Sequence, residues 1–288
     1  MLSPVAAHVI CALLFAADLV ARACRIRWYL AALGQRISLS QALVLNAWGD
    51  AAAGLTPMRF GGEMAKFAGL LRAGVGPRRS VLVLGLEAAI TYPIVALFGG
   101  WLAWRLAPAW WDAVRPAVEQ ALATGWPWAV AVGGVVLLAG LGVWYARRRE
   151  PRVVEPGAFR GMLHQVPAAP LAAGAAVSLF NVVARTLMLP VLALTLPDHP
   201  PLGVMMVGSF VLLYSQLVLP TPAGAGAVEL GFLAGVAGDL GAGEGGLLVA
   251  WRFYTVGAGA ALGAILAVSL VGVRPVLRAV GRFAGPRA

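Results

Sequence analysis

The chain has 288 residues, of which 60% are hydrophobic and 12% are charged, and it carries a formal net charge of +10 at pH 7. Soluble globular domains are about half apolar and about a quarter charged, so this composition excludes an ordinary soluble protein. Several apolar stretches reach the roughly 20 residues that an α-helix needs to cross a bilayer core. We therefore expect residues 1–288 to form a single membrane domain, an all-α integral membrane protein built as a polytopic helical bundle.

Taken in chain order, the apolar stretches predict about five full membrane spans and two broken ones. The full spans are expected at about 4–21, 80–104, 127–146, 168–196 and 248–272. The broken stretches, 38–75 and 203–240, are interrupted by TPMRFGGE and PTPAGAG. Proline cannot continue a helix and glycine weakens one, so each broken stretch is predicted to form a re-entrant hairpin of two half-helices. The residues expected at the bends are Pro57, Gly61, Gly62, Pro220, Pro222, Gly224 and Gly226.

The positive charges indicate how the spans are oriented. Eighteen of the 22 Lys and Arg residues fall in four groups, within 22–36, 59–79, 147–160 and 274–287. Because Lys and Arg favour cytoplasmic loops, this distribution predicts a multi-pass protein of the cell membrane, with its N-terminus outside and its C-terminus in the cytoplasm. The first hairpin then enters the membrane from the cytoplasm, and the second enters it from outside. Nucleic acid is not an expected partner, because no basic face with interleaved aromatic residues is present.

The two halves of the chain resemble each other in opposite orientations. Residues 4–104 contain a span, a hairpin and a second span, and residues 168–272 contain the same three elements in the same order. The span 127–146 and a cytoplasmic loop at 147–166 link the two halves. The bends TPMRFGGEMAKFAG and TPAGAGAVELGFLAG also match in sequence. Inverted repeats with broken helices at matching positions indicate a transport site near the middle of the membrane. The alternative is chance similarity between two Gly/Pro turns in an Ala/Gly-rich chain.

Charged residues inside the apolar stretches mark the candidate substrate-binding site. A charged side chain at the centre of a span costs about 2.5–3.5 kcal/mol on insertion scales, so it persists where it is paired, hydrated or functional. Glu63 and Glu229 each follow a bend, where the N–H groups of a helix N-terminus favour a carboxylate. They either cap the returning half-helices or meet nearby cations at the centre. The candidate substrate-binding residues are Arg59, Glu63, Lys66, Arg185, Glu229 and Arg252.

The spacing of these residues predicts particular contacts. Arg59 lies four residues before Glu63 and Lys66 lies three residues after it, which are contact distances on a helix. Arg185 lies too deep in its span to reach water easily, so we expect an acidic partner such as Glu229 or Glu87. The planar guanidinium suits a phosphate as well as a carboxylate. A basic pocket between helices indicates an anionic lipid head group, and the alternative is a structural ion pair inside the membrane.

Motifs for catalysis and metal binding are missing from the sequence. His8, His164 and His199 have no cysteine or carboxylate at metal-ligand spacing, and there is no G-x-S-x-G or Walker motif. Cys11 and Cys24 form neither a disulfide framework nor a metal site. We expect no enzyme activity, no metal and no cofactor.

The two bends carry motifs that resemble those of a known family. TPMRFGGEMAK and PTPAGAGAVE are similar to the TP…GGE…R/K and P-x-P-G-G-x-G-x-x-E signatures of the lysylphosphatidylglycerol synthase transmembrane region. This family is also called the flippase-like domain, and it includes the YbhN-type membrane proteins. The resemblance covers roughly residues 15–272, with departures at Ala223, where glycine is usual, and at Glu87 and Thr91, where an R-x-x-D pair is common. The motif residues are Pro57, Gly61, Gly62, Glu63 and Lys66, then Pro220, Pro222, Gly224, Gly226 and Glu229.

The resemblance implies a flippase-like membrane protein that acts on membrane lipids. We expect a lipid translocase that binds a polar or anionic head group at a midplane site between the two hairpins. One alternative is an ion or small-solute secondary transporter that uses the same site. Another is a non-transporting membrane module that docks a separate lipid- or glycan-modifying enzyme. The expected partners are membrane lipids and, for the last alternative, that enzyme.

Overall fold

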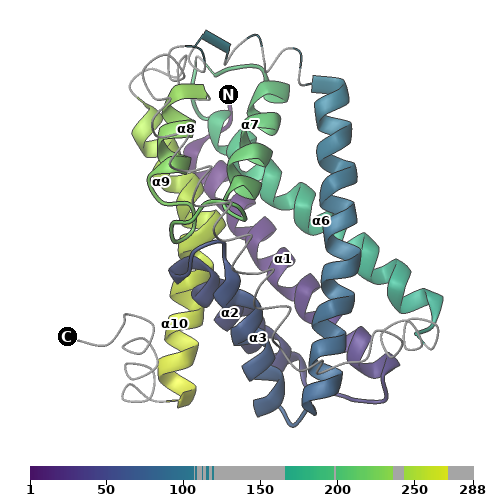
Figure 1. The fold of residues 1–288 in the computed structure, drawn as a ribbon. Coiled ribbons are helices and arrows are strands. Elements are labelled where there is room, and N and C mark those ends of the chain that lie inside the picture. The colour runs from purple at the N-terminus through teal and green to yellow at the C-terminus, as the bar shows by residue number, and fades with distance from the viewer. Residues whose placement is uncertain are drawn as a thin grey trace.

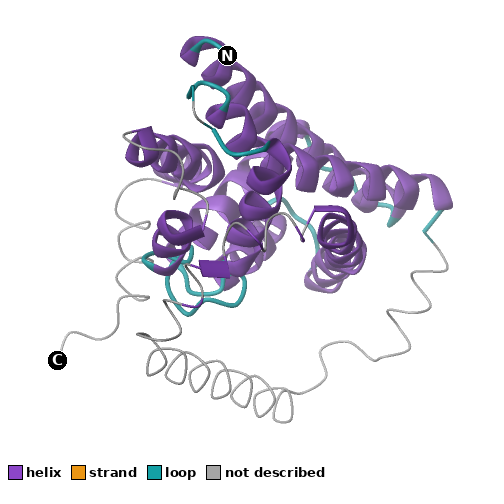
Figure 2. Cartoon of the chain, turned by 90° about the horizontal axis from the view of Figure 1, so that it is seen from above, coloured by secondary structure: helices purple, strands orange, loops and turns teal. Residues whose placement is uncertain are grey.

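Long apolar helices form most of the structure. The computed structural model describes residues 1–106, 166–197, 199–235 and 243–271, with a few isolated positions between 108 and 119. Figure 2 shows the described segments from above, almost entirely helical and joined by short loops.

Four helices in the described part are long and apolar enough to cross a membrane. They are α1 (Pro4–Ala32), the helix Pro77–Leu106, α6 (Ala168–Ala193) and the continuous helical segment Gly245–Leu270. These helices correspond to four of the predicted spans and confirm a polytopic helical membrane protein. The predicted span 127–146 and nearly all of the predicted loop 147–166 lie outside the described residues.

The first broken stretch forms a helical hairpin, as predicted. Ser38 caps α2 (Leu39–Leu55): its hydroxyl accepts a hydrogen bond from the Gln41 N–H at 3.1 Å, and the Gln41 side chain accepts one from the Ser38 N–H at 2.9 Å. This capping box determines where the helix begins. α2 ends just before Pro57, which restricts the preceding residue to extended backbone (φ −118°, ψ 144°). The chain then returns as α3 (Phe60–Arg72), packed against α2.

The second broken stretch also forms two half-helices, as predicted. α7 (Leu202–Ser215) and α8 (Ala227–Gly235) are joined by a turn that contains Pro220 and Pro222. Gly224 (φ 69°) and Gly226 (φ 85°) occupy the left-handed region in this turn. Glycine adopts that region without steric cost, which explains two of the glycines in the motif.

The tips of the two hairpins meet. Pro57 and Pro222 form an isolated antiparallel bridge, and the Met58 N–H donates a hydrogen bond to the Leu219 carbonyl oxygen at 3.2 Å. In Figure 1, α2 and α3 lie in the lower half of the molecule, and α7 and α8 lie in the upper half. The hairpins therefore approach each other from opposite ends of the bundle.

The last span contains an irregular turn at the level of the hairpin tips. α9 (Glu244–Arg252) passes into a π-helical turn, η2 (Phe253–Gly257), and continues as α10 (Ala258–Val271). Such π-turns inside α-helices are frequent at functional sites. They often mark positions where a side chain must point in a direction that a regular helix would not allow.

α10 packs closely against α2. A Cβ atom added at Gly263 would lie 2.1 Å from the Ala47 carbonyl oxygen, and one added at Gly259 would lie 2.9 Å from the Asp50 Cβ. Small residues four positions apart allow membrane helices to approach in this way. Gly259 therefore packs against α2 within the chain.

α1 is longer than the predicted span 4–21. The sequence interpretation ended this span at the first arginines and assigned them to a cytoplasmic group, but the helix continues to Ala32. Arg22 and Arg25 are buried inside the bundle. The prediction was wrong because neither proline nor glycine interrupts the chain before Gly34, and because both arginines find carboxylates on other helices.

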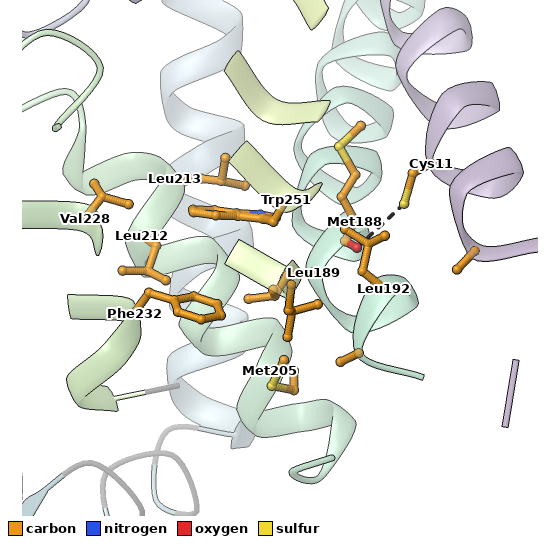
Figure 3. Close-up of a cluster of buried hydrophobic side chains, with 13 residues drawn as sticks. Cys11, Met188, Leu189, Leu192, Met205, Leu212, Leu213, Val228, Phe232 and Trp251 are labelled. Atoms are coloured by element: carbon orange, nitrogen blue, oxygen red, sulfur yellow. Dashed lines mark hydrogen bonds between the residues drawn. The ribbon is translucent and has the colours of Figure 1, made fainter. Parts of the chain in front are cut away.

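Two apolar cores flank the centre of the bundle, one beside each hairpin. The core beside α7 and α8 contains Trp251 and Phe232, whose stacked rings have centroids 6.3 Å apart (Figure 3). The core beside α2 and α3 contains Tyr29 of α1 and Leu45 of α2. α1 contributes to both cores, with Cys11 in the first and Tyr29 in the second. The middle of α1 therefore lies between the two cores.

Candidate functional site

Polar side chains gather at the middle of the long helices. Asp18, the central residue of α1, accepts a hydrogen bond from the side-chain amide of Asn181 near the centre of α6. Arg25 donates to the hydroxyls of Ser178 on α6, at 2.7 Å, and of Thr91, near the centre of the helix Pro77–Leu106, at 3.2 Å. Charges at this depth are costly unless they are paired. Three clusters of charged residues supply the pairing.

The first cluster joins α1, α2 and α6 through two arginines and two aspartates. The Arg22 guanidinium donates to both carboxylate oxygens of Asp50, at 3.1 and 2.7 Å, and to Asp18 at 3.1 Å. The Arg185 Nε donates to Asp18 at 3.3 Å, and another guanidinium nitrogen lies 3.8 Å from Asp50. Bidentate pairs between arginine and a carboxylate are among the strongest ionic contacts in proteins. The two positive and two negative charges of this cluster compensate each other.

The second cluster forms around Glu87 on the helix Pro77–Leu106. One oxygen of Glu87 accepts hydrogen bonds from Arg25 and, at 3.0 Å, from the Lys66 ammonium group. Lys66 also donates to Glu63 at 3.2 Å. The side chain of Glu63 is 55% exposed, whereas that of Glu87 is 7% exposed. Lys66 therefore links a buried carboxylate to one that faces outward beside the first hairpin.

The third cluster closes the turn of the second hairpin. The Arg252 Nε donates to Glu229 at 2.6 Å, and a second guanidinium nitrogen donates to the Ala223 carbonyl oxygen at 3.0 Å. The other oxygen of Glu229 accepts from the Gly226 N–H at 2.7 Å. Glu229 is thus both a helix cap and the partner of a span arginine. The sequence left open whether Glu229 caps its helix or meets a cation, and the structure contains both contacts.

Arg59 differs from the other charged residues because a neutral side chain is its partner. Its guanidinium donates to the Gln216 side-chain oxygen at 3.0 Å, and no ion pair with a carboxylate occurs within the part of the chain that the structure describes. Arg59 is therefore a surplus positive charge at the tip of the first hairpin.

The backbone at this tip is unusual. Met58 and Arg59 both adopt left-handed conformations, with φ of 51° and 59°. Such a conformation is uncommon for residues other than glycine and costs roughly 1–2 kcal/mol per residue. Ala223 in the opposite tip also has a positive φ, of 48°. Strain of this kind persists where the surrounding structure holds the turn, and it is enriched at functional sites.

The structure brings together the six predicted site residues only in part. The predicted contact between Glu63 and Lys66 is present, and Glu229 pairs with Arg252. The predicted contact between Arg59 and Glu63 is absent from the structure, because Arg59 precedes α3 in a left-handed conformation that does not continue the helix. Arg59 instead reaches the second hairpin.

The predicted partners of Arg185 were wrong. Neither Glu229 nor Glu87 pairs with it, because these two carboxylates are engaged by Arg252 and by Arg25 with Lys66. The partners of Arg185 are Asp18 and Asp50.

Several residues of the central clusters were missed as site residues by the sequence interpretation. Asp18 was overlooked, and Arg22 and Arg25 were assigned to a loop. A signal was present, because these three residues follow each other at spacings of four and three, which places them on one helical face. Asp50 was not among the predicted site residues, and Glu87 was considered as a partner for Arg185. Their actual partners lie on other helices, which the spacing of residues in the sequence does not reveal.

Metal ligands were also sought in the structure. In the described ranges there is no group of three or more His, Cys, Asp or Glu side chains that could hold a metal ion. The charged centre is built mainly from carboxylates and arginines that are paired with each other.

The fold and the charged centre define a multi-pass helical membrane protein with two opposed hairpins. The chain belongs to the lysylphosphatidylglycerol synthase TM region family, whose sequence model matches residues 2–279. The motif residues of both hairpin tips lie within this match, and the family suggested by the two bends is therefore confirmed. No curated protein and no solved structure shows significant similarity to the chain.

Proposed function

We propose that the protein is a membrane lipid translocase that binds a polar or anionic lipid head group between the tips of its two hairpins. The observation that carries this proposal is the surplus charge of Arg59 at the point where the tips meet. An arginine at this depth without a carboxylate partner in the described residues is costly unless a ligand or water compensates it. Its contact with Gln216 satisfies one donor and leaves the charge uncompensated.

The accessible charges around the tips support binding of a head group. Glu63 and Glu229 have side chains that are 55% and 33% exposed, in contrast to the buried aspartates of the first cluster. Arg185 and Arg252 add two cationic groups on the neighbouring spans, where they pair with Asp18 and Glu229. A basic region between membrane helices is suited to the head group of an anionic lipid. In this proposal, Arg59, Glu63, Lys66, Arg185, Glu229 and Arg252 contribute to the binding site.

The opposed hairpins support a mechanism of alternating access. Each hairpin closes one side of the centre, and the bridge between Pro57 and Pro222 joins their tips. Rocking of one half against the other would separate the tips and expose the site to one leaflet at a time, as in other inverted-repeat transporters. Because the sequence has no ATP-binding motif, the movement would draw on an ion gradient or on the lipid gradient itself. We propose that the protein lies in the cell membrane with its N-terminus outside. Its proposed partners are membrane lipids, and we propose no enzymatic reaction for it.

A reversible lock at the tips tests this proposal. The double variant Pro57→Cys/Pro222→Cys is prepared in a background in which Cys11 and Cys24 are replaced by alanine. Opposed residues of an antiparallel pair have Cα atoms about 4.5–5.5 Å apart, and this spacing suits a disulfide. Proteoliposomes that contain a fluorescent short-chain phosphatidylglycerol are then assayed by extraction of the outer leaflet with serum albumin.

We expect oxidation to stop lipid movement and reduction to restore it, because the tips must separate during transport. The two single-cysteine variants are the controls, since they cannot form the lock. Restoration by the reductant also demonstrates that the double variant is folded. Unchanged lipid movement in fully cross-linked protein would contradict a path between the tips. Movement of a small ion without any lipid movement would favour the solute transporter instead.

A further inference from the structure

We propose that Arg59 recognises a phosphate group at the hairpin tips and that its hydrogen bond to Gln216 is the contact that the phosphate replaces. This inference rests on the proposed function and specifies the ligand chemistry of the same site. The phosphate is carried by a lipid head group or is free phosphate, and both present the same oxygen atoms to a guanidinium.

The balance of charges at the centre favours an anion over a neutral or cationic ligand. The clusters and Arg59 together contain six cationic side chains and five carboxylates in the described part of the chain. The cationic side chains are Arg22, Arg25, Arg59, Lys66, Arg185 and Arg252. The carboxylates are those of Asp18, Asp50, Glu63, Glu87 and Glu229. One negative charge at Arg59 would complete the neutralisation.

Compared with Arg22 and Arg252, Arg59 has more N–H donors free for a ligand. Arg22 donates to Asp18 and to both oxygens of Asp50, so its guanidinium is already occupied. Arg252 is held by Glu229 and by a backbone carbonyl oxygen. The Arg59 guanidinium has five N–H donors, of which one is used by Gln216. Its remaining donors match the planar, two-point geometry with which arginine binds phosphate oxygens.

The position of Gln216 suits a partner that can be exchanged. Gln216 is the C-cap residue of α7 and is 1% exposed, so it remains in place when Arg59 moves. Its amide also donates weakly to the Leu212 carbonyl oxygen, at 3.5 Å. A neutral amide holds a guanidinium less strongly than a carboxylate does, because the amide lacks the negative charge that attracts the guanidinium. A phosphate can therefore displace Gln216, whereas it could not displace Asp50 from Arg22.

Replacement of Gln216 by a phosphate at Arg59 would weaken the contact between the hairpins. The bond from Arg59 to Gln216 is one of three links between the tips, together with the Pro57–Pro222 bridge and the bond from the Met58 N–H to the Leu219 carbonyl oxygen. A phosphate that occupies Arg59 removes one of these links. Binding of the ligand would therefore weaken the closed contact at the time when the ligand must pass.

Equilibrium binding measured in dodecyl maltoside, a phosphate-free detergent, tests the inference. The probes are a fluorescent short-chain phosphatidic acid and the diacylglycerol with the same fluorophore, which differ only in the phosphate. The proteins are the wild type, Arg59→Gln, Arg59→Lys and Gln216→Ala. All three residues at position 59 have a side-chain Cβ, so the cost of the left-handed backbone is similar in each. Gln216→Ala is the matched control, because it breaks the same hydrogen bond but keeps the charge.

We expect the wild type to bind phosphatidic acid roughly ten- to a hundred-fold more tightly than diacylglycerol, the range of a charge-assisted hydrogen bond. Arg59→Gln should lose this preference, and Arg59→Lys should retain part of it. Gln216→Ala should bind phosphatidic acid at least as tightly as the wild type. Displacement of the probe by millimolar inorganic phosphate supports recognition of free phosphate, and retention of the probe under this competition supports a lipid-borne phosphate.

Equal binding of both probes by the wild type would overturn the inference, as would an unchanged preference in Arg59→Gln. If Arg59→Gln does not fold, a clear loss of phosphatidic acid binding in Gln216→Ala would overturn it instead. The binding assay is independent of transport. Lipid movement without any phosphate preference would refute this inference but not the proposed translocase function. Arg59-dependent binding without lipid movement would refute the translocase function but not this inference.

Discussion

The charged residues at the centre of the bundle differ most in their access to solvent. Asp18 is 1% exposed and is shared by Arg22, Arg185 and Asn181. Glu63 is half exposed, and in the described part of the chain its ion pair is with Lys66, which also pairs with Glu87. Removal of one partner from a buried ion pair is costly because the remaining charge stays in a medium of low polarity. Loss of one partner from a buried pair should therefore destabilise the fold, whereas the exposed charges near the tips are available for a ligand.

A substitution at Asp18 tests this division. We expect Asp18→Asn to destabilise the protein by about 3–5 kcal/mol, because Arg22 and Arg185 then share one carboxylate. The measurement is thermal unfolding of the purified protein in detergent. Glu63→Gln is the matched control and should unfold near the wild-type temperature, because Lys66 retains Glu87. Similar losses for both variants would contradict the distinction between buried and accessible charges.

At the scale of the elements, backbone approach and helix breaks shape the centre. α2 ends just before Pro57 and α7 ends at Ser215, before the turn that contains Pro220 and Pro222, so the tips of the two hairpins meet inside the bundle. Gly259 and Gly263 let α10 pack directly on α2, close to Asp50. The position of the first ion cluster therefore depends on contacts to which α10 contributes glycine backbone instead of side chains.

Replacement of one of these glycines should separate α2 from α10. Gly263→Ala places a methyl group 2.1 Å from the Ala47 carbonyl oxygen, so the helices must move apart. We expect a loss of about 1–3 kcal/mol in the free energy of unfolding, measured by thermal unfolding in detergent. Gly100→Ala is the control, because nothing lies within 4 Å of its added Cβ. Since alanine favours helices by about 1 kcal/mol over glycine at both positions, the difference between the variants isolates the clash.

The whole molecule has two different ends. The N-terminus of α1 lies in the upper part of Figure 1, and the loop between α3 and the helix Pro77–Leu106 lies at the bottom. Arg72, Arg78 and Arg79 are exposed at that lower end. Because arginine favours the cytoplasmic side, the lower end should face the cytoplasm.

Single cysteines at the two ends test this orientation. In the background without Cys11 and Cys24, we expect a membrane-impermeant maleimide to label Ser3→Cys in intact cells. Gly76→Cys, which lies in the exposed lower loop, should be labelled only after the membrane is permeabilised. The reverse pattern would invert the predicted topology, together with the leaflet to which each hairpin opens.

The sequence by itself determined the class of the protein, the approximate positions of four helical spans and both helix breaks. These features depend on local properties: the apolar length of a stretch, and the backbone restrictions that Pro57, Pro222 and the bend glycines impose. The family signature belongs to the same level, because its motif residues lie within the two bends. These local properties depend on residues that are close together in the sequence, so they could be predicted from the sequence.

The tertiary structure decided which charges pair and which one is left over. Arg22 and Arg25 lie inside the bundle, where Asp50 and Glu87 on other helices pair with them. Arg185 binds Asp18 instead of the predicted partners, and Arg59 crosses to Gln216 on the opposite hairpin. An ion pair inside a membrane forms between whichever groups the packing of helices brings within reach. That reach depends on the relative positions of distant segments, which hydropathy and local spacing do not contain.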